Sequence, residues 1–142
     1  MSDIVELRVP AQAEYLQLVR AVVGAVAAAD PGITSDRVTD LRLAVSEAVT
    51  NAIRAQQQFG IPDRVIIRCN VAESSIEIEI ADRGPGFDPD QALDLPAVDT
   101  PERLDHESGL GLTLMRQLAD ETVIESGPDG TAVRLVVRYG DQ

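Results

Sequence analysis

The sequence contains no lysine and no tryptophan, and it has one cysteine and one histidine. The single cysteine, Cys69, excludes a disulfide framework and a cysteine-based zinc site within the chain. The single histidine, His106, leaves no second imidazole for a histidine metal site, and no nucleophile motif accompanies it for a Ser-His-Asp triad. The two tyrosines and two phenylalanines are too few and too scattered to form a base-stacking platform.

Positive charge is also scarce. The chain carries 24 acidic and 12 basic side chains, for a formal net charge of −12, and every basic residue is arginine. This balance excludes nucleic acid and anionic membranes as direct partners, because both require a basic footprint, and it favours a basic protein partner. No apolar run approaches the ~20 residues needed to cross a bilayer, and the first residues do not form a signal peptide. We therefore expect a cytoplasmic protein.

A length of 142 residues suits one domain over residues 1–142. Alternating and helical apolar spacing predicts strands over 4–9, 64–71, 74–81, 121–125 and 131–138, and helices over 11–29, 34–58 and 109–120. Strands in hairpins and helices in succession indicate an α+β fold, a two-layer sandwich whose mixed, mostly antiparallel sheet carries helices on one face. Residues 83–107 are interrupted by glycines and prolines, so we expect a long functional loop, a lid over about 87–108.

Glu47 and Asn51 stand four residues apart in the second predicted helix, so their side chains project from the same face. A carboxylate and an amide oxygen in that register can position a hydroxyl and ligate a hard cation such as Mg²⁺. A solvated polar helix face has the same pattern, and this pair alone does not decide between the two interpretations.

Three glycine-containing segments follow. Asp82-Arg83-Gly84-Pro85-Gly86 places a carboxylate at a strand end, beside glycines that let the backbone approach a ligand, although an ordinary turn has the same composition. Gly109 and Gly111 open the third predicted helix, where free N–H groups can bind an anion. They follow a long loop rather than the first strand of a βαβ unit, which excludes a dinucleotide fingerprint. Gly130-Thr131 stands at the start of the last predicted strand. The threonine hydroxyl can hydrogen-bond a ligand there, although the same two residues also follow ordinary hairpin turns.

In their order and spacing these segments resemble the motifs of the GHKL ATPase superfamily. Ser46-Glu47-Ala48-Val49-Thr50-Asn51-Ala52 looks like its N box, and Asp82-Arg83-Gly84-Pro85-Gly86 resembles its G1 box. Gly109-Leu110-Gly111-Leu112 is similar to the G2 box, and Gly130-Thr131 to the threonine motif on the following strand. Within the superfamily the chain is most similar to the small anti-sigma-factor serine kinases of the RsbW type, and the resemblance covers nearly all of it.

The resemblance implies a histidine-kinase-like ATPase domain, the Bergerat fold, with ATP between the sheet and the helices. Glu47 would be the general base acting on a serine hydroxyl, and Asn51 would ligate Mg²⁺. Asp82 would accept a hydrogen bond from the adenine amine, with support from Thr131, and the G1 glycines would shape the adenine pocket. The G2 glycines would present backbone N–H groups to phosphates. The implied nucleotide-binding residues are Asn51, Asp82, Gly84, Gly86, Gly109, Leu110, Gly111, Leu112 and Thr131.

The resemblance further implies an anti-sigma factor with ATP-dependent serine kinase activity. It would sequester a sigma factor, phosphorylate an anti-anti-sigma antagonist on serine, and form a homodimer. Two positions depart from the pattern: Ala55 stands where many relatives carry a basic residue, and Glu107 where relatives often place arginine. Phosphate charge would then have to come from Arg54 or Arg103. These departures favour an alternative, a nucleotide-dependent partner-switching module with little or no kinase activity. A detached sensor-kinase ATPase domain is disfavoured because the dimerisation helices are missing.

Overall fold

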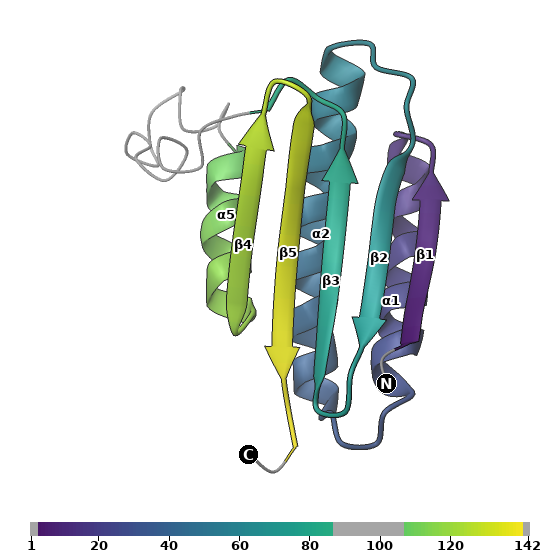
Figure 1. Cartoon of the computed structure of the whole chain (residues 1–142), viewed down its shortest axis with the longest axis vertical. Helices are drawn as coiled ribbons and strands as arrows, with labels where there is room; N and C mark the ends of the chain where they lie inside the picture. Colours follow the sequence, from purple (N-terminus) through teal and green to yellow (C-terminus); the bar gives the residue numbers. More distant parts are fainter. Residues whose placement is uncertain (1–2, 87–106, 141–142) are drawn as a thin grey trace.

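The computed structural model describes residues 3–86 and 107–140, which form one sheet and the helices packed against it. The strands lie in the order β1-β2-β3-β5-β4, and the helices cover one face of the sheet (Figure 1). The strands are β1 (Asp3–Val9), β2 (Val65–Val71), β3 (Ser75–Asp82), β4 (Glu121–Gly127) and β5 (Gly130–Arg138). The helices are α1 (Leu16–Ala28), α2 (Ser35–Gln58) and α5 (Glu107–Leu118), with a 3₁₀ turn, η1 (Ala13–Tyr15), before α1.

Every neighbouring pair of strands in this sheet is antiparallel. The expected two-layer α+β arrangement is confirmed, but the expectation of a mixed sheet was wrong. The reason lies in the connections. The connection from β1 to β2 consists of two successive helices, α1 and α2, which run in opposite directions. The chain therefore enters β2 from the end at which it left β1, and the two strands are antiparallel. The crossover through α5 makes β4 run in the same direction as β3, but β5 lies between them, so these two parallel strands never pair (Figure 1).

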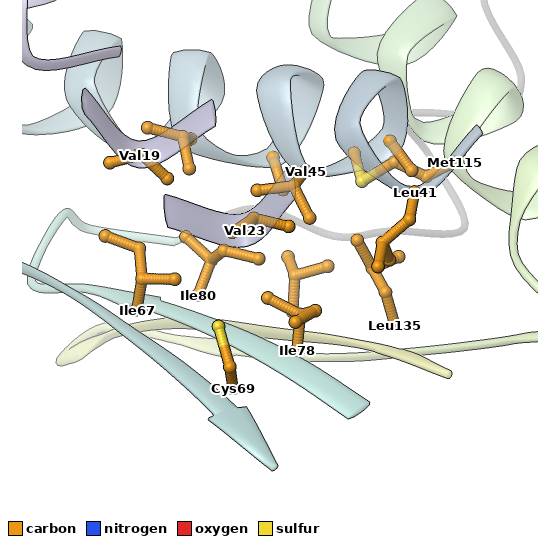
Figure 2. Close-up of a cluster of buried hydrophobic side chains, with 14 of the residues drawn as sticks. Val19, Val23, Leu41, Val45, Ile67, Cys69, Ile78, Ile80, Met115 and Leu135 are labelled. Carbon is orange, nitrogen blue, oxygen red and sulfur yellow. The ribbon is translucent and has the colours of Figure 1, made fainter. Parts of the chain in front are cut away.

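The core lies between the sheet and the helices and follows the alternation of the strands. Ile76, Ile78 and Ile80 of β3 point to the helical layer and are buried, as expected from their spacing. Figure 2 shows Val45 of α2 and Leu135 of β5 among the side chains that fill this layer.

Cys69 of β2 belongs to the same core, with 1% of its surface exposed. Burial raises the pKa of its thiol to about 11. The thiolate is the reactive form of cysteine, so this side chain is chemically quiet in the folded protein.

Helix α2 occupies the middle of the helical layer, with contacts to both α1 and α5. The helix begins after Thr34, whose side-chain oxygen accepts a hydrogen bond from the Arg37 backbone N–H at 3.2 Å. It ends before Gly60, whose φ of 63° suits glycine. The second predicted helix is thus confirmed over nearly its whole length. None of the helices in the described residues is long and apolar enough to cross a membrane.

One side-chain link ties the α1–α2 connection to the C-terminal end of β5. The Tyr139 hydroxyl donates to Asp30 Oδ2 at 2.7 Å, and the Gly32 N–H donates to Asp30 Oδ1 at 2.8 Å. The hydrogen bond from Tyr139 lowers the pKa of Asp30, and the bond from Gly32 adds to this effect. Burial, together with the Asp30 carboxylate, raises the pKa of Tyr139 to about 12.

We expect Tyr139→Phe to lower the melting temperature at neutral pH by about 3 °C, because it removes this hydrogen bond. In the folded state the pKa of Tyr139 lies above the unfolded value of about 10. The stabilisation is therefore fully present below pH 10 and is lost as the pH rises through about 12. Thermal melts of both proteins across this range should converge at high pH; a constant difference would contradict the assignment.

Candidate functional site

A cavity of about 250 Å³ lies between α2 and the adjoining ends of β3 and β5. Its apolar wall is formed by Ala48 and Ala52 of α2, Ile80 of β3 and Val133 of β5. The predicted site residues among those that line it are Asn51, Asp82, Gly86, Leu112 and Thr131. The four sequence motifs, far apart along the chain, therefore meet at one cavity.

Asp82 is the last residue of β3 and lies opposite Thr131 of β5 in the strand register. The Gly84 backbone N–H donates to Asp82 Oδ1 at 2.8 Å. Burial raises the pKa of Asp82, and hydrogen bonds from the backbones of Gly84 and Thr131 partly oppose that rise. A carboxylate that is partly desolvated in this way is an electrostatically strong acceptor for a ligand donor.

Thr131 is buried, with 6% of its surface exposed, and its Oγ1 lies 2.7 Å from the Ser126 Oγ of β4. Either hydroxyl can donate in this pair, so the Thr131 hydroxyl can turn its proton toward Ser126 or toward the cavity. Ser126 was not among the predicted site residues. The only signal for it in the sequence is its place on β4 opposite Thr131, which becomes visible once the hairpin register is known.

Close backbone contacts explain the glycines of this region. Gly86 has a φ of 82°, and a Cβ there would lie 2.2 Å from the Gly127 carbonyl oxygen. Gly130 has a φ of 143°, and a Cβ there would lie 2.2 Å from the Asp82 carbonyl oxygen. Side chains at either position would push the segment after β3 away from the β4–β5 hairpin. Gly84 does not line the cavity; a Cβ there would meet the Ala55 Cβ at 2.9 Å.

The two N-box residues are placed differently. Asn51 is half-buried and lines the cavity, whereas Glu47, also half-buried, is not among the lining residues. Among the ion pairs of the described residues none includes Glu47. Glu47 lies one helical turn before Asn51 on α2, next to the lining residue Ala48, and has no ion-pair partner in the described part of the chain.

The G2 segment lies in the first turns of α5, which begins at Glu107, two residues before Gly109. The expectation that the glycines open the helix is corrected accordingly, and Glu107 and Ser108 are helical. The first four N–H groups of an α-helix lack partners within it, and here Gly109 and Leu110 are among them. Gly111 is the fifth residue, so by position its N–H belongs to the helix. Residues 87–106 of the predicted lid lie outside the described residues.

Sequence reasoning missed Gln56, a fully buried polar residue of α2. Its Oε1 accepts a hydrogen bond from the Arg83 backbone N–H at 2.9 Å, directly beside Asp82. A signal was present: Gln56 continues the buried stripe that runs through Val45, Val49 and Ala52. A glutamine on such a stripe indicates a specific buried partner.

The sequence profile described as "Histidine kinase-like ATPase domain" matches residues 9–137. The chain is 39% identical over 128 residues to the serine-protein kinase RsbW of Bacillus subtilis (strain 168). The matched region covers 88% of this chain and 79% of the relative. It is 37% identical over 133 residues to the serine-protein kinase RsbW of Staphylococcus aureus, covering 91% and 83%. The chain belongs to the histidine kinase-like ATPase family and, within it, to the RsbW serine-protein kinases.

Solved structures share the fold. The RsbU and RsbW domains of Rv1364c from Mycobacterium tuberculosis match with a TM-score of 0.71 at 19% identity, over 99% of this chain and 33% of that longer one. The SiaB-SiaC complex from Pseudomonas aeruginosa matches with a TM-score of 0.63 at 10% identity, over 94% of this chain and 88% of that chain. At these identities the likeness supports the fold alone.

Proposed function

We propose that this chain is an anti-sigma factor with ATP-dependent serine kinase activity. It would hold a sigma factor and phosphorylate an anti-anti-sigma antagonist on serine, in the cytoplasm and as a homodimer. The observation that carries the proposal is the convergence of the four motifs on one cavity between α2 and the ends of β3 and β5. Membership of the RsbW serine-protein kinases supports the same activity.

The base of ATP would occupy the inner part of the cavity. Its flat apolar surface suits the wall made by Ala52, Ile80 and Val133. The exocyclic amine of adenine would donate to Asp82, which the Gly84 N–H already holds in place. Thr131 would support the same base through its hydroxyl.

The phosphates would lie between α2 and the start of α5. The free N–H groups in the first turn of α5 and the positive end of its dipole suit an anion. Arg54 supplies the cationic side chain among the residues that line the cavity.

The residues fit a magnesium ion held mainly by the nucleotide. Mg²⁺ commonly takes one or two protein oxygens and fills its remaining positions with phosphate and water. The Asn51 side chain, which lines the cavity, offers one such oxygen. The ion would neutralise phosphate charge.

Glu47 would accept the proton of the antagonist's serine hydroxyl while the serine oxygen attacks the γ-phosphorus of ATP. The bond between the γ-phosphorus and the oxygen that bridges it to the β-phosphate would break, and ADP would leave. Phosphoryl transfer depends mainly on positioning and charge neutralisation, so one base and a firm phosphate site are sufficient protein machinery. The side chain of Glu47 lies one turn before Asn51, within the same helix face.

The contact between Ala55 and Gly84 favours one alternative. A Cβ at Gly84 would meet the Ala55 Cβ at 2.9 Å, so this position is packed tightly by a small residue instead of carrying a cation toward the phosphates. A partner-switching module that binds nucleotide but transfers phosphate poorly would suit this arrangement. Incubation with γ-labelled ATP and a cognate anti-anti-sigma protein separates the two functions: labelled serine supports the kinase, and binding without label supports the module.

We expect Asn51→Ala to weaken ATP binding in the presence of Mg²⁺ by roughly tenfold and to change Mg²⁺-free binding little. The physical reason is the loss of a metal-ligating oxygen. Titration calorimetry with and without Mg²⁺ measures both values. Asn70→Ala, at the other asparagine, on β2 and outside the cavity, is the matched control. An equal Mg²⁺ dependence in wild type and Asn51→Ala would remove Asn51 from the metal site.

A further inference from the structure

Gln56 uses both ends of its amide group inside the protein. It lies near the end of α2 with 0% of its surface exposed. Its Nε2 donates to the Asp63 carbonyl oxygen, and its Oε1 accepts from the Arg83 N–H at 2.9 Å. One side chain on the helix therefore bonds the backbone just before β2 and just after β3.

Both of these backbone groups lie beyond the paired part of the two strands. The last paired residues of β2 and β3 are Ile66 and Ala81, so the sheet supplies no β2 partner to the Arg83 N–H. A backbone group left without a partner in such a position costs free energy. Gln56 provides that partner, and thereby fixes where the chain leaves β3.

The same segment is confined on its other sides. Gly84 packs against Ala55 of α2, and Gly130 of β5 approaches the Asp82 carbonyl so closely that a Cβ would lie 2.2 Å from it. The residue between these contacts is Arg83, the one that Gln56 bonds. The direction of the neighbouring Asp82 side chain into the cavity therefore depends on the Gln56 bond. Gln56 itself does not line the cavity, so it would act without touching a ligand.

We infer that Gln56 is a positioning residue that sets the direction of the Asp82 carboxylate for recognition of the base, an inference that rests on the proposed ATP site. Adenine presents an exocyclic amine to such an acceptor, whereas guanine presents a carbonyl oxygen at the corresponding ring position. A carboxylate held in one direction rejects guanine, because two acceptors then face each other. Gln56 thus contributes to the choice of ATP over GTP.

The test is Gln56→Met, which keeps a long unbranched side chain and removes both hydrogen bonds. We expect the Kd for ATP to rise roughly tenfold and the Kd for GTP to change less, so the GTP-to-ATP ratio of Kd values falls. Tyr139→Phe is the matched control. It also removes one side-chain hydrogen bond, but at the opposite end of β3 and β5, where Tyr139 bonds Asp30 and Ser74.

Fluorescence or calorimetric titrations with both nucleotides, run well below each melting temperature, decide the outcome. A fall in the ratio for Gln56→Met but not for Tyr139→Phe supports the positioning role. An unchanged ratio, with only a lower melting temperature, overturns it and leaves Gln56 a structural residue. If Gln56→Met does not fold, Gln56→Glu is measured instead; it retains an oxygen for the Arg83 N–H and loses only the donor to the Asp63 carbonyl, so its ratio should stay at the wild-type value, and a fall in that ratio would overturn the role of the Arg83 bond. A wild-type protein that binds neither nucleotide would instead overturn the proposed function.

Discussion

Glu47→Ala should lower the rate of serine phosphorylation by about 10²–10⁴-fold and leave the ATP dissociation constant nearly unchanged. Glu47 lies one turn before Asn51 on α2 and is not among the residues that line the cavity, so its removal takes no contact from the bound nucleotide. A base that takes up the serine proton acts in the transition state, which lowers turnover instead of affinity. The measurements are the phosphotransfer rate at saturating ATP, the ATP dissociation constant and the melting temperature.

Asp40→Ala is the matched control for this experiment. Asp40 is also an acidic residue of α2, but it pairs with Arg37 at 3.2 Å and lies outside the cavity. A structural role for Glu47 would make Glu47→Ala lose melting temperature and ATP affinity together. A variant that transfers phosphate at nearly the wild-type rate would exclude Glu47 as the base.

Asp82→Asn should weaken ATP binding by roughly 10- to 100-fold and raise the melting temperature by about 1–3 °C. The affinity falls because the charged acceptor for the adenine amine is lost. The stability rises because burial raises the pKa of Asp82, so its charge is unfavourable in the folded state at neutral pH. That penalty is present above the folded-state pKa and disappears as the pH falls through it, so the two proteins should converge in stability in acid.

Asp30→Asn is the comparison variant, and we expect it to change the melting temperature in the opposite direction. Like Asp82, Asp30 accepts a hydrogen bond from a glycine N–H two residues further along the chain. Its pKa is lowered by the hydrogen bond from Tyr139, so its charge favours the folded state and Asn should reduce stability. Asp30→Asn should leave ATP affinity unchanged. If both variants shift the melting temperature in the same direction, the desolvation argument for Asp82 is wrong.

The helices and strands that could be predicted from the sequence are those determined by interactions between residues close together in the chain. The start of α2 follows from the Thr34 cap, and β3 follows from alternating isoleucines that all face the helices. The strand pairing could not be read in the same way, because it depends on β5 inserting between β3 and β4. Local spacing contains no information about that insertion.

The residues of the candidate site can likewise be divided into those recognisable from the local sequence and those whose role depends on contacts between distant segments. Asp82 and Asn51 are recognisable because a polar residue at a strand end or on a helix face contradicts its surroundings. The reason for Gly86 is the Gly127 carbonyl 2.2 Å from a would-be Cβ, a contact between segments about 40 residues apart in sequence. Gln56 was missed because its partners, backbone groups beyond the ends of two strands, exist only in the folded arrangement. Contacts of this kind require the three-dimensional structure.

The buried thiol of Cys69 gives the protein a built-in reporter of its own opening. Cys69 is the only cysteine in the chain and sits in the core on β2, beside the strand that ends in Asp82. A thiol reagent can reach it only when the helical layer separates from the sheet, so the labelling rate measures how often the core opens. Nucleotide bound only to the closed form would slow labelling in proportion to its saturation. Ligand affinity can thus be read from the unmodified protein, without an attached dye or an added cysteine.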